Sequence, residues 1–176
     1  MSFMLKIVGA KGYIKDVDKF LDEINSYSKK HKLVIQVFNA DLIYGEKHLV
    51  SSVEHATRAI INKTNTTKTL EMEILLYASG ERQLKLAIPK IGVKKGNANI
   101  AFVFVNPIDK PGNKIPNNIV YELINKLSFK QDDKVLQGNE NTLKKFGINK
   151  NEIKTVTKTK YGDLILEKVA MVDIIK

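Results

Sequence analysis

The sequence predicts an α+β fold in which a helical block joins a small mixed β-sheet. Three observations support this prediction: strand-like segments flank residues 46–92, that stretch is helical throughout, and further helical segments follow a proline-rich loop. A chain of 176 residues can bury a sizeable core without disulfides or metal ions. We therefore expect one domain, residues 1–176, with the helical block at about 46–92 inserted between strands of the sheet.

The predicted strands lie at residues 3–8, 33–38 and 100–105. A segment with helical periodicity, in which Phe20 and Ile24 share one face, separates the first two. The third strand is apolar at every position, as expected of a strand that is covered on both faces. These segments predict the sheet, with the third strand near its middle.

The helical block contains three predicted helices, at residues 46–63, 70–78 and 80–88. Apolar residues recur every three or four positions in the first helix, which marks the face that packs on the core. Pro89 weakens the end of the third helix, and Gly92 supplies a stop. Because the second helix is predicted to end at residue 78 and the third to begin at residue 80, a tight turn joins them.

Three of the four prolines fall in residues 106–118, which predicts an exposed loop within the domain. Helices are predicted after it, at residues 119–127, 141–146, 149–156 and 163–175. The last helix is apolar around almost its whole circumference, more than one core-facing stripe requires. Either it passes through the middle of the fold or its outer face binds a partner, and we favour a protein interface.

The composition narrows the class of partner. The chain carries 29 basic and 19 acidic residues, a net charge of +10, which favours polyanions such as nucleic acid. A genome biased toward lysine codons is the alternative explanation of that charge. The absence of cysteine excludes disulfides and thiolate chemistry, and no apolar run reaches the ~20 residues that span a bilayer. We therefore expect a cytoplasmic protein without a membrane partner.

No catalytic residue, cofactor or metal site is expected. The chain has no Walker loop, dinucleotide fingerprint or nucleophile elbow. His48 and His55 lie about 10.5 Å apart along a helix axis, too far to share one ion. Glu71 and Glu73 point away from each other on a helix, so helix-start charge explains them better than acid–base catalysis.

The tight turn between the second and third helices is the strongest candidate for binding chemistry. If the third helix begins at Ser79 or Gly80, its first backbone N–H groups are unpaired and favour an anion. Arg82, one of only two arginines, could then hold a phosphate through two parallel hydrogen bonds. The alternative is a structural corner in which Arg82 pairs with Glu81 or Glu73.

The polar face of the helix at residues 46–63 supports a nucleic-acid interpretation. If the helices pack antiparallel, five basic side chains would line a shallow surface for a nucleic-acid strand: Lys47, His48, Arg58, Lys63 and Arg82. The nearby aromatic candidates for base stacking are Phe38, Tyr44 and Tyr77. An ordinary solvated helix face is the alternative.

A longer pattern carries a family resemblance. Glu73-Ile74-Leu75-Leu76 is followed by Ser79-Gly80-Glu81-Arg82-Gln83 and then by Ala87-Ile88-Pro89-Lys90-Ile91-Gly92-Val93. In this combination, over about residues 33–105, the chain resembles the KEOPS-complex subunit family that includes the animal protein TPRKB. A weaker match continues through residues 143–148 and 162–165.

The resemblance implies a non-catalytic subunit that binds the small atypical kinase-ATPase of KEOPS and the single-stranded 3′ CCA end of tRNA. Such a subunit supports threonylcarbamoyladenosine (t6A) modification of tRNA, with catalysis on another subunit. A protein-interaction regulator of the kinase subunit with no direct tRNA role is the alternative.

The residue patterns described above and the resemblance together give the expected site residues. Eight residues are expected to bind tRNA: Lys47, His48, Arg58, Lys63, Ser79, Gly80, Arg82 and Gln83. Six apolar residues are expected to bind the kinase: Ile148, Ile153, Val156, Leu164, Val169 and Val172.

Overall fold

The computed structural model describes residues 4–175, which form two compact units. The first, called the sheet unit below, comprises residues 4–40 and Val93–Val135. The second, called the helical unit, comprises Asp41–Gly92 and residues 136–175. The α+β class is confirmed, while the expectation of a single domain stays a prediction.

The sheet unit contains all four strands and two of the helices described. In chain order its elements are β1 (Leu5–Ile14), α1 (Val17–His31), β2 (Val34–Asn39), β3 (Gly96–Val105), α5 (Asn117–Lys126) and β4 (Lys130–Gln131). Two short 3-10 helices lie where the chain passes between units: η1 (Ala40–Leu42) and η2 (Asp133–Leu136). All three strands expected from the sequence are present, although β1 and β3 are longer than predicted and the start of the first predicted strand, at residue 3, lies outside the described residues.

The strand order is β2-β3-β1-β4, and every pairing described is antiparallel. The sequence prediction of a mixed sheet was wrong in this respect. Strands β1 and β2 run in the same direction because α1 connects them, but β3 lies between them and pairs with both. Val105, for example, pairs with Leu5 on one side and Val34 on the other.

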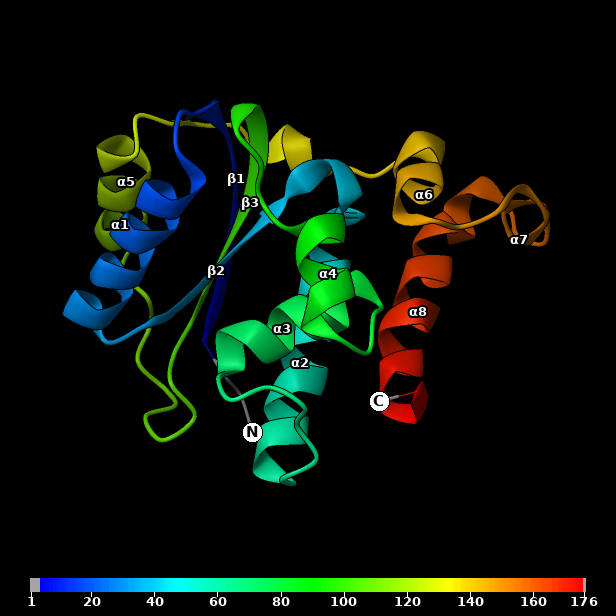
Figure 1. Cartoon of the computed structure of the whole chain (residues 1–176), viewed down its shortest axis with the longest axis horizontal. Helices are drawn as coiled ribbons and strands as arrows, with labels where there is room; N and C mark the ends of the chain where they lie inside the picture. The colour runs from blue at the N-terminus through cyan, green and yellow to red at the C-terminus, as the bar shows by residue number, and fades with distance from the viewer. Residues whose placement is uncertain (1–3, 176) are drawn as a thin grey trace. The chain divides into compact units, whose positions relative to one another are not determined.

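Helices α1 and α5 cover one face of the sheet (Figure 1). Phe20 and Ile24 of α1 pack in one core with Leu123 of α5 and with Phe102 and Phe104 of β3. Burying a large apolar side chain contributes roughly 1.5–3 kcal/mol. This shared core holds the start of α1 and the end of α5 beside the end of β1.

The helical unit contains six α-helices and one 3-10 helix within the described residues. They are α2 (Gly45–Ile61), α3 (Leu70–Ser79), α4 (Leu84–Ile91), α6 (Glu140–Phe146), α7 (Lys150–Lys154), η3 (Lys158–Lys160) and α8 (Tyr161–Ile175). Helix α2 packs against both α3 and α8, and α6 and α7 pack against α8 as well. Leu49 and Val53 of α2 are fully buried, as their helical spacing predicts.

Helix α8 has one buried face and one exposed apolar face. Leu164, Ile165, Val169 and Val172 are buried, and Ile174 on the other side is 75% exposed. The interior position considered from the sequence therefore holds for one face of α8, and a partner on the other face stays a prediction. No helix within residues 4–175 combines the length and apolar character that crossing a membrane requires.

Candidate functional site

The turn between α3 and α4 differs from the predicted one in where the second helix starts. Gly80 is not the start of α4 but the residue that ends α3, with a left-handed φ of 67° and its N–H donating to the Tyr77 carbonyl. A Cβ at Gly80 would lie 3.2 Å from Cβ of Lys168. Glycine is therefore favoured here by backbone conformation and by close packing. Helix α4 begins at Leu84, after Gln83 as its N-cap.

The side chains on either side of Gly80 are engaged within the unit. The hydroxyl of Ser79 is buried, donates to the Leu76 carbonyl at 2.7 Å and accepts from the Glu81 N–H at 3.1 Å. The Glu81 carboxylate in turn pairs with the Lys90 ammonium at 3.0 Å. That ammonium also lies 4.1 Å from the ring centroid of Phe146. These contacts fix the shape of the turn.

Arg82 is exposed at the tip of this fixed turn. Neither predicted internal partner holds it, because Glu81 pairs with Lys90 and Glu73 accepts hydrogen bonds from Thr67. Among residues 4–175, its guanidinium has no ion pair or hydrogen-bond partner. Arg82 is thus available to a ligand outside the chain.

The start of α4 offers backbone donors next to Arg82. The side chain of Gln83 makes no capping hydrogen bond, and the helix begins its backbone bonding with the Leu86 and Ala87 N–H groups on the Gln83 carbonyl. The first N–H groups of α4 therefore point out of the helix without a partner among the described residues. The predicted anion site accordingly moves from Gly80 to the start of α4.

His48 lies inside the helical unit, so its predicted place on an RNA-binding surface is corrected. It is 1% exposed, its Nδ1 accepts the Tyr44 N–H at 3.2 Å, and its Nε2 lies 2.8 Å from the Ala78 carbonyl. Burial lowers the pKa of His48 from 6.5 to about 4, and the positive charge of Lys90 also lowers it. His48 is therefore neutral at pH 7 and joins α2 to the end of α3.

Arg58 is part of an internal cluster. Its Nη2 lies 2.8 Å from Nδ1 of His55 and 3.7 Å from Oδ2 of Asp173 on α8. The Tyr77 hydroxyl donates to the other oxygen of Asp173. Burial, followed by this hydrogen bond, raises the pKa of the Tyr77 hydroxyl well above its usual value. The cluster ties α2, α3 and α8 together, although the Arg58 side chain stays 56% exposed.

The two predicted RNA-binding lysines are exposed but belong to opposite ends of α2. Lys47 lies in its first turn, beside a pocket of about 510 Å³, and Lys63 follows its last turn. At 1.5 Å per residue the helix separates them by more than about 20 Å. They cannot share one phosphate, so a common surface would have to follow an extended strand.

The predicted partner-binding residues lie mostly in the interior. Ile148, Ile153, Leu164, Val169 and Val172 are buried, and only Val156 is half-buried. They hold α6, α7 and α8 together, so as the chain stands they offer little surface to a partner. The exposed apolar residues of α8 are instead Met171, Ile174 and Ile175.

The described residues do not form a metal site: within residues 4–175, no group of three or more His, Asp or Glu side chains is placed to hold an ion.

Two comparisons with known proteins identify the family of this chain. The family model described as kinase binding protein CGI-121 matches residues 14–173. The regulatory protein Cgi121 of Methanocaldococcus jannaschii is 30% identical over 148 residues, which cover 82% of this chain and 86% of that relative. The family resemblance found in the sequence is confirmed, and the chain belongs to the CGI-121 family of kinase binding proteins.

Proposed function

We propose that this chain is a non-catalytic, cytoplasmic subunit of KEOPS that binds the kinase-ATPase subunit and the 3′ CCA end of tRNA, in support of t6A modification. The kinase half of the proposal is supported by the family to which the chain belongs. The RNA half depends on one observation: Arg82 is exposed and, within residues 4–175, has no partner, and it lies beside N–H groups at the start of α4 that have none there either.

The chemistry at the start of α4 suits a phosphodiester. Helix N-termini favour anions, and a guanidinium can bind two phosphate oxygens in parallel. Lys85, one residue into the helix, is also exposed and adds positive charge. The net charge of +10 attracts polyanions over a longer range. A single-stranded tail can bring its backbone to such a turn because its phosphates are not confined by a duplex.

The RNA proposal is tested with intact tRNA and the same tRNA lacking its terminal CCA. We expect the purified chain to bind the intact tRNA more tightly, and the affinity to fall as salt rises. Arg82→Glu should weaken binding of intact tRNA by about tenfold or more, since it replaces a phosphate contact with a repulsion. Lys68→Glu, an equally exposed change in the helical unit, is the control and should have a much smaller effect.

Two results would contradict this half of the proposal. Equal affinity for intact and trimmed tRNA would remove the claim of tail recognition. Unchanged binding by Arg82→Glu would show that the turn does not contact RNA. Either result, with kinase binding intact, would favour a regulator of the kinase without a direct tRNA role; the internal use of His48 and Arg58 already points in that direction.

For the kinase we propose the exposed apolar face of α8, formed by Met171, Ile174 and Ile175. Ile174→Glu should weaken kinase binding by about tenfold or more, because it removes apolar burial and desolvates a charge. Ile88→Glu is the matched control, since Ile88 is an exposed isoleucine on α4.

The buried residue Ile153 provides the contrasting case. Ile153→Glu should destabilise the helical unit by about 3 kcal/mol or more, because it buries an unpaired charge. Kinase binding should then fall only as the protein unfolds. A stable Ile153→Glu variant that no longer binds the kinase would restore the partner set predicted from sequence and contradict the α8 face.

A further inference from the structure

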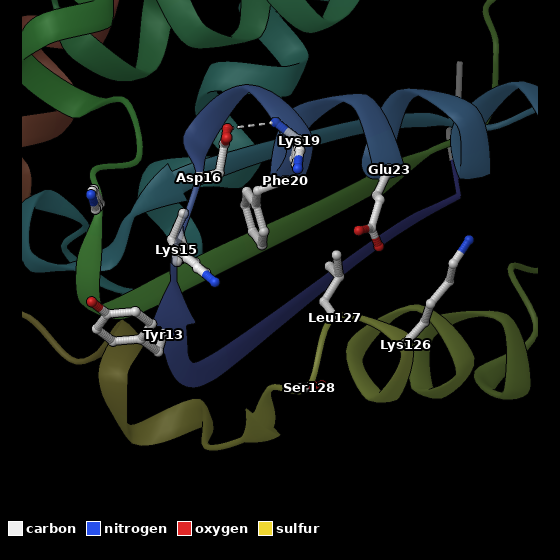
Figure 2. Close-up of a pocket in the computed structure, with 11 residues that line it drawn as sticks. Tyr13, Lys15, Asp16, Lys19, Phe20, Glu23, Lys126, Leu127 and Ser128 are labelled. Atoms are coloured by element: carbon white, nitrogen blue, oxygen red, sulfur yellow. Dashed lines mark hydrogen bonds between the residues drawn. The ribbon is translucent and has the colours of Figure 1, made fainter.

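A second concave basic site lies in the sheet unit, where β1 ends and α1 begins (Figure 2). Its volume is about 430 Å³, within the range of pockets that bind small molecules or single nucleotides. Strand register explains part of its lining. Ile14, the last residue of β1, pairs with Gly96, the first residue of β3. Lys15 and Lys95 therefore lie next to each other, just beyond the same end of the two strands. The end of α5 completes the pocket with Lys126.

The pocket is lined by lysines whose side chains form no ion pair among the described residues. Lys15, Lys19, Lys95 and Lys126 line it and are exposed, and none of them has an ion pair within residues 4–175. The two carboxylates of the lining are Asp16 and Glu23, so four lysines less two acids leave a charge of +2. Asp16 already accepts the Lys19 backbone N–H at 3.0 Å as the cap of α1. An anion is the ligand that this arrangement favours.

The pocket also has an aromatic and apolar part. Tyr13 is 59% exposed, unusual for so large a ring, and lies at one end of the pocket (Figure 2). Phe20 and Leu127 face each other in the middle, from α1 and from the residue that follows α5 (Figure 2). The hydroxyl of Ser128 adds a polar group at the edge. A free phosphate would use the lysines but not the exposed ring of Tyr13, whereas a nucleotide could contact both.

We propose that this pocket binds one nucleotide of a single-stranded RNA, with the phosphate held by the lysines and the base stacked on Tyr13. Base–aromatic stacking tolerates any base, so the contact is not sequence-specific. This inference deepens the proposed function, on which it rests for the identity of the RNA: it gives the RNA a contact in the sheet unit, separate from Arg82 in the helical unit.

The test measures binding of the full chain to a fluorescein-labelled single-stranded hexaribonucleotide by anisotropy. Lys15→Glu/Lys126→Glu should weaken binding by about tenfold or more and lower the magnitude of the slope of log K against log salt by about 0.7, as expected when the one phosphate in the pocket is no longer neutralised. The control Lys110→Glu/Lys114→Glu makes the same change of charge in an exposed loop of the same unit and should lower the affinity much less. Tyr13→Ala should cost roughly fivefold or more, and Tyr13→Phe little.

Each alternative outcome overturns the inference. Equal losses of affinity in Lys15→Glu/Lys126→Glu, called the pocket pair, and in Lys110→Glu/Lys114→Glu would show that the RNA is attracted by nonspecific charge. A Tyr13→Ala variant with unchanged affinity would remove the stacked base. Displacement of the probe by free AMP at concentrations near the dissociation constant of the probe would identify a mononucleotide site and not an RNA contact.

The probe also separates this inference from the proposed function. It carries no CCA end, and Arg82→Glu is measured beside the pocket variants. Loss of hexanucleotide binding in the pocket pair but not in Arg82→Glu supports the pocket even if tail recognition fails. Loss of tail discrimination in Arg82→Glu, with the pocket pair unchanged, keeps the proposed function and rejects the pocket.

Discussion

The turn before α4 and the pocket before α1 both place positive side chains beside the start of a helix, but they use them differently. At the turn, Lys90 pairs with Glu81 and contacts Phe146, whereas Arg82 and Lys85 are exposed and have no ion pair among the described residues. In the pocket, four lysines have no ion pair among the described residues. A net charge therefore does not reveal which cations are structural, and packing decides which ones a ligand can use.

The difference predicts that substitutions in the internal contacts that support the turn change stability, whereas substitutions of Arg82 and of the pocket lysines change binding. The largest effect is expected for His48, through pH. Its folded pKa of about 4 lies below the usual 6.5, so the unfolded chain binds more protons in between. The contribution of neutral His48 to the free energy of unfolding is fully present above pH 6.5. It falls by about 3 kcal/mol as the pH is lowered toward 4.

The measurement is urea unfolding between pH 7 and pH 4, compared with His48→Gln. Glutamine retains a donor and an acceptor but does not titrate, so the variant should lose correspondingly less stability on acidification. Subtracting its curve also removes the contribution of exposed carboxylates such as Glu140 and Glu152, whose pKa values are lowered mainly by hydrogen bonds from Lys144 and Lys168. Parallel curves for the two proteins would show that His48 is not a buried neutral link.

Gly80 tests the shape of the turn. Gly80→Ala should cost about 1–2 kcal/mol, because alanine is strained in the left-handed region and its Cβ would crowd Lys168. Gly45→Ala is the control, with a φ of +75° and no atom within 4 Å of the added Cβ, and it isolates the backbone strain. Thermal unfolding gives both values. Equal costs would indicate that close packing at Gly80 contributes nothing.

Lys90 tests whether a lysine that contacts other side chains of the turn stabilises the fold. Lys90→Gln removes the pair with Glu81 and the contact with Phe146, and should cost about 1 kcal/mol or less. Lys144→Gln removes an exposed pair with Glu140 within one helix and should cost about 0.3 kcal/mol. If chemical denaturation shows no greater loss for Lys90→Gln, the contrast between the turn and a solvated pair disappears.

The smallest effect on stability is expected in the pocket. Lys15→Glu/Lys126→Glu should change the free energy of unfolding by less than about 0.5 kcal/mol, since neither lysine has an internal partner among the described residues. Chemical denaturation at moderate salt is the measurement. A loss above 1 kcal/mol, beyond that of Lys110→Glu/Lys114→Glu, would mean that these lysines serve the fold.

Local patterns predicted much of this molecule. The periodicity of α2, the turn after α3 and the apolar run of β3 all follow from neighbours in the sequence. Gly80 was misassigned because glycine is acceptable both at a helix start and after a helix end, and the packing of Lys168 against it is a long-range contact. His48 was predicted to lie on the surface because histidine is a polar residue, and the sequence does not show which elements bury it.

Two further differences have the same physical origin. The apolar circumference of α8 does not say which face its neighbours cover, so the residues predicted to bind a partner include Leu164, Val169 and Val172, which are buried within the unit. The pocket was missed because residues 13–23, Lys95 and Lys126 meet only through the register of β1 with β3 and the packing of α5. The residues adjacent to each of these segments in the sequence do not indicate that the segments lie together in the fold.

The central claim is that a kinase binding protein of this family also holds the 3′ end of tRNA at the turn before α4. The most direct test compares the affinity of the chain for intact tRNA and for tRNA lacking CCA, each with the wild type and with Arg82→Glu. We expect the wild type to prefer the intact tRNA and Arg82→Glu to lose that preference. An identical preference in both proteins, or none in the wild type, would contradict the account.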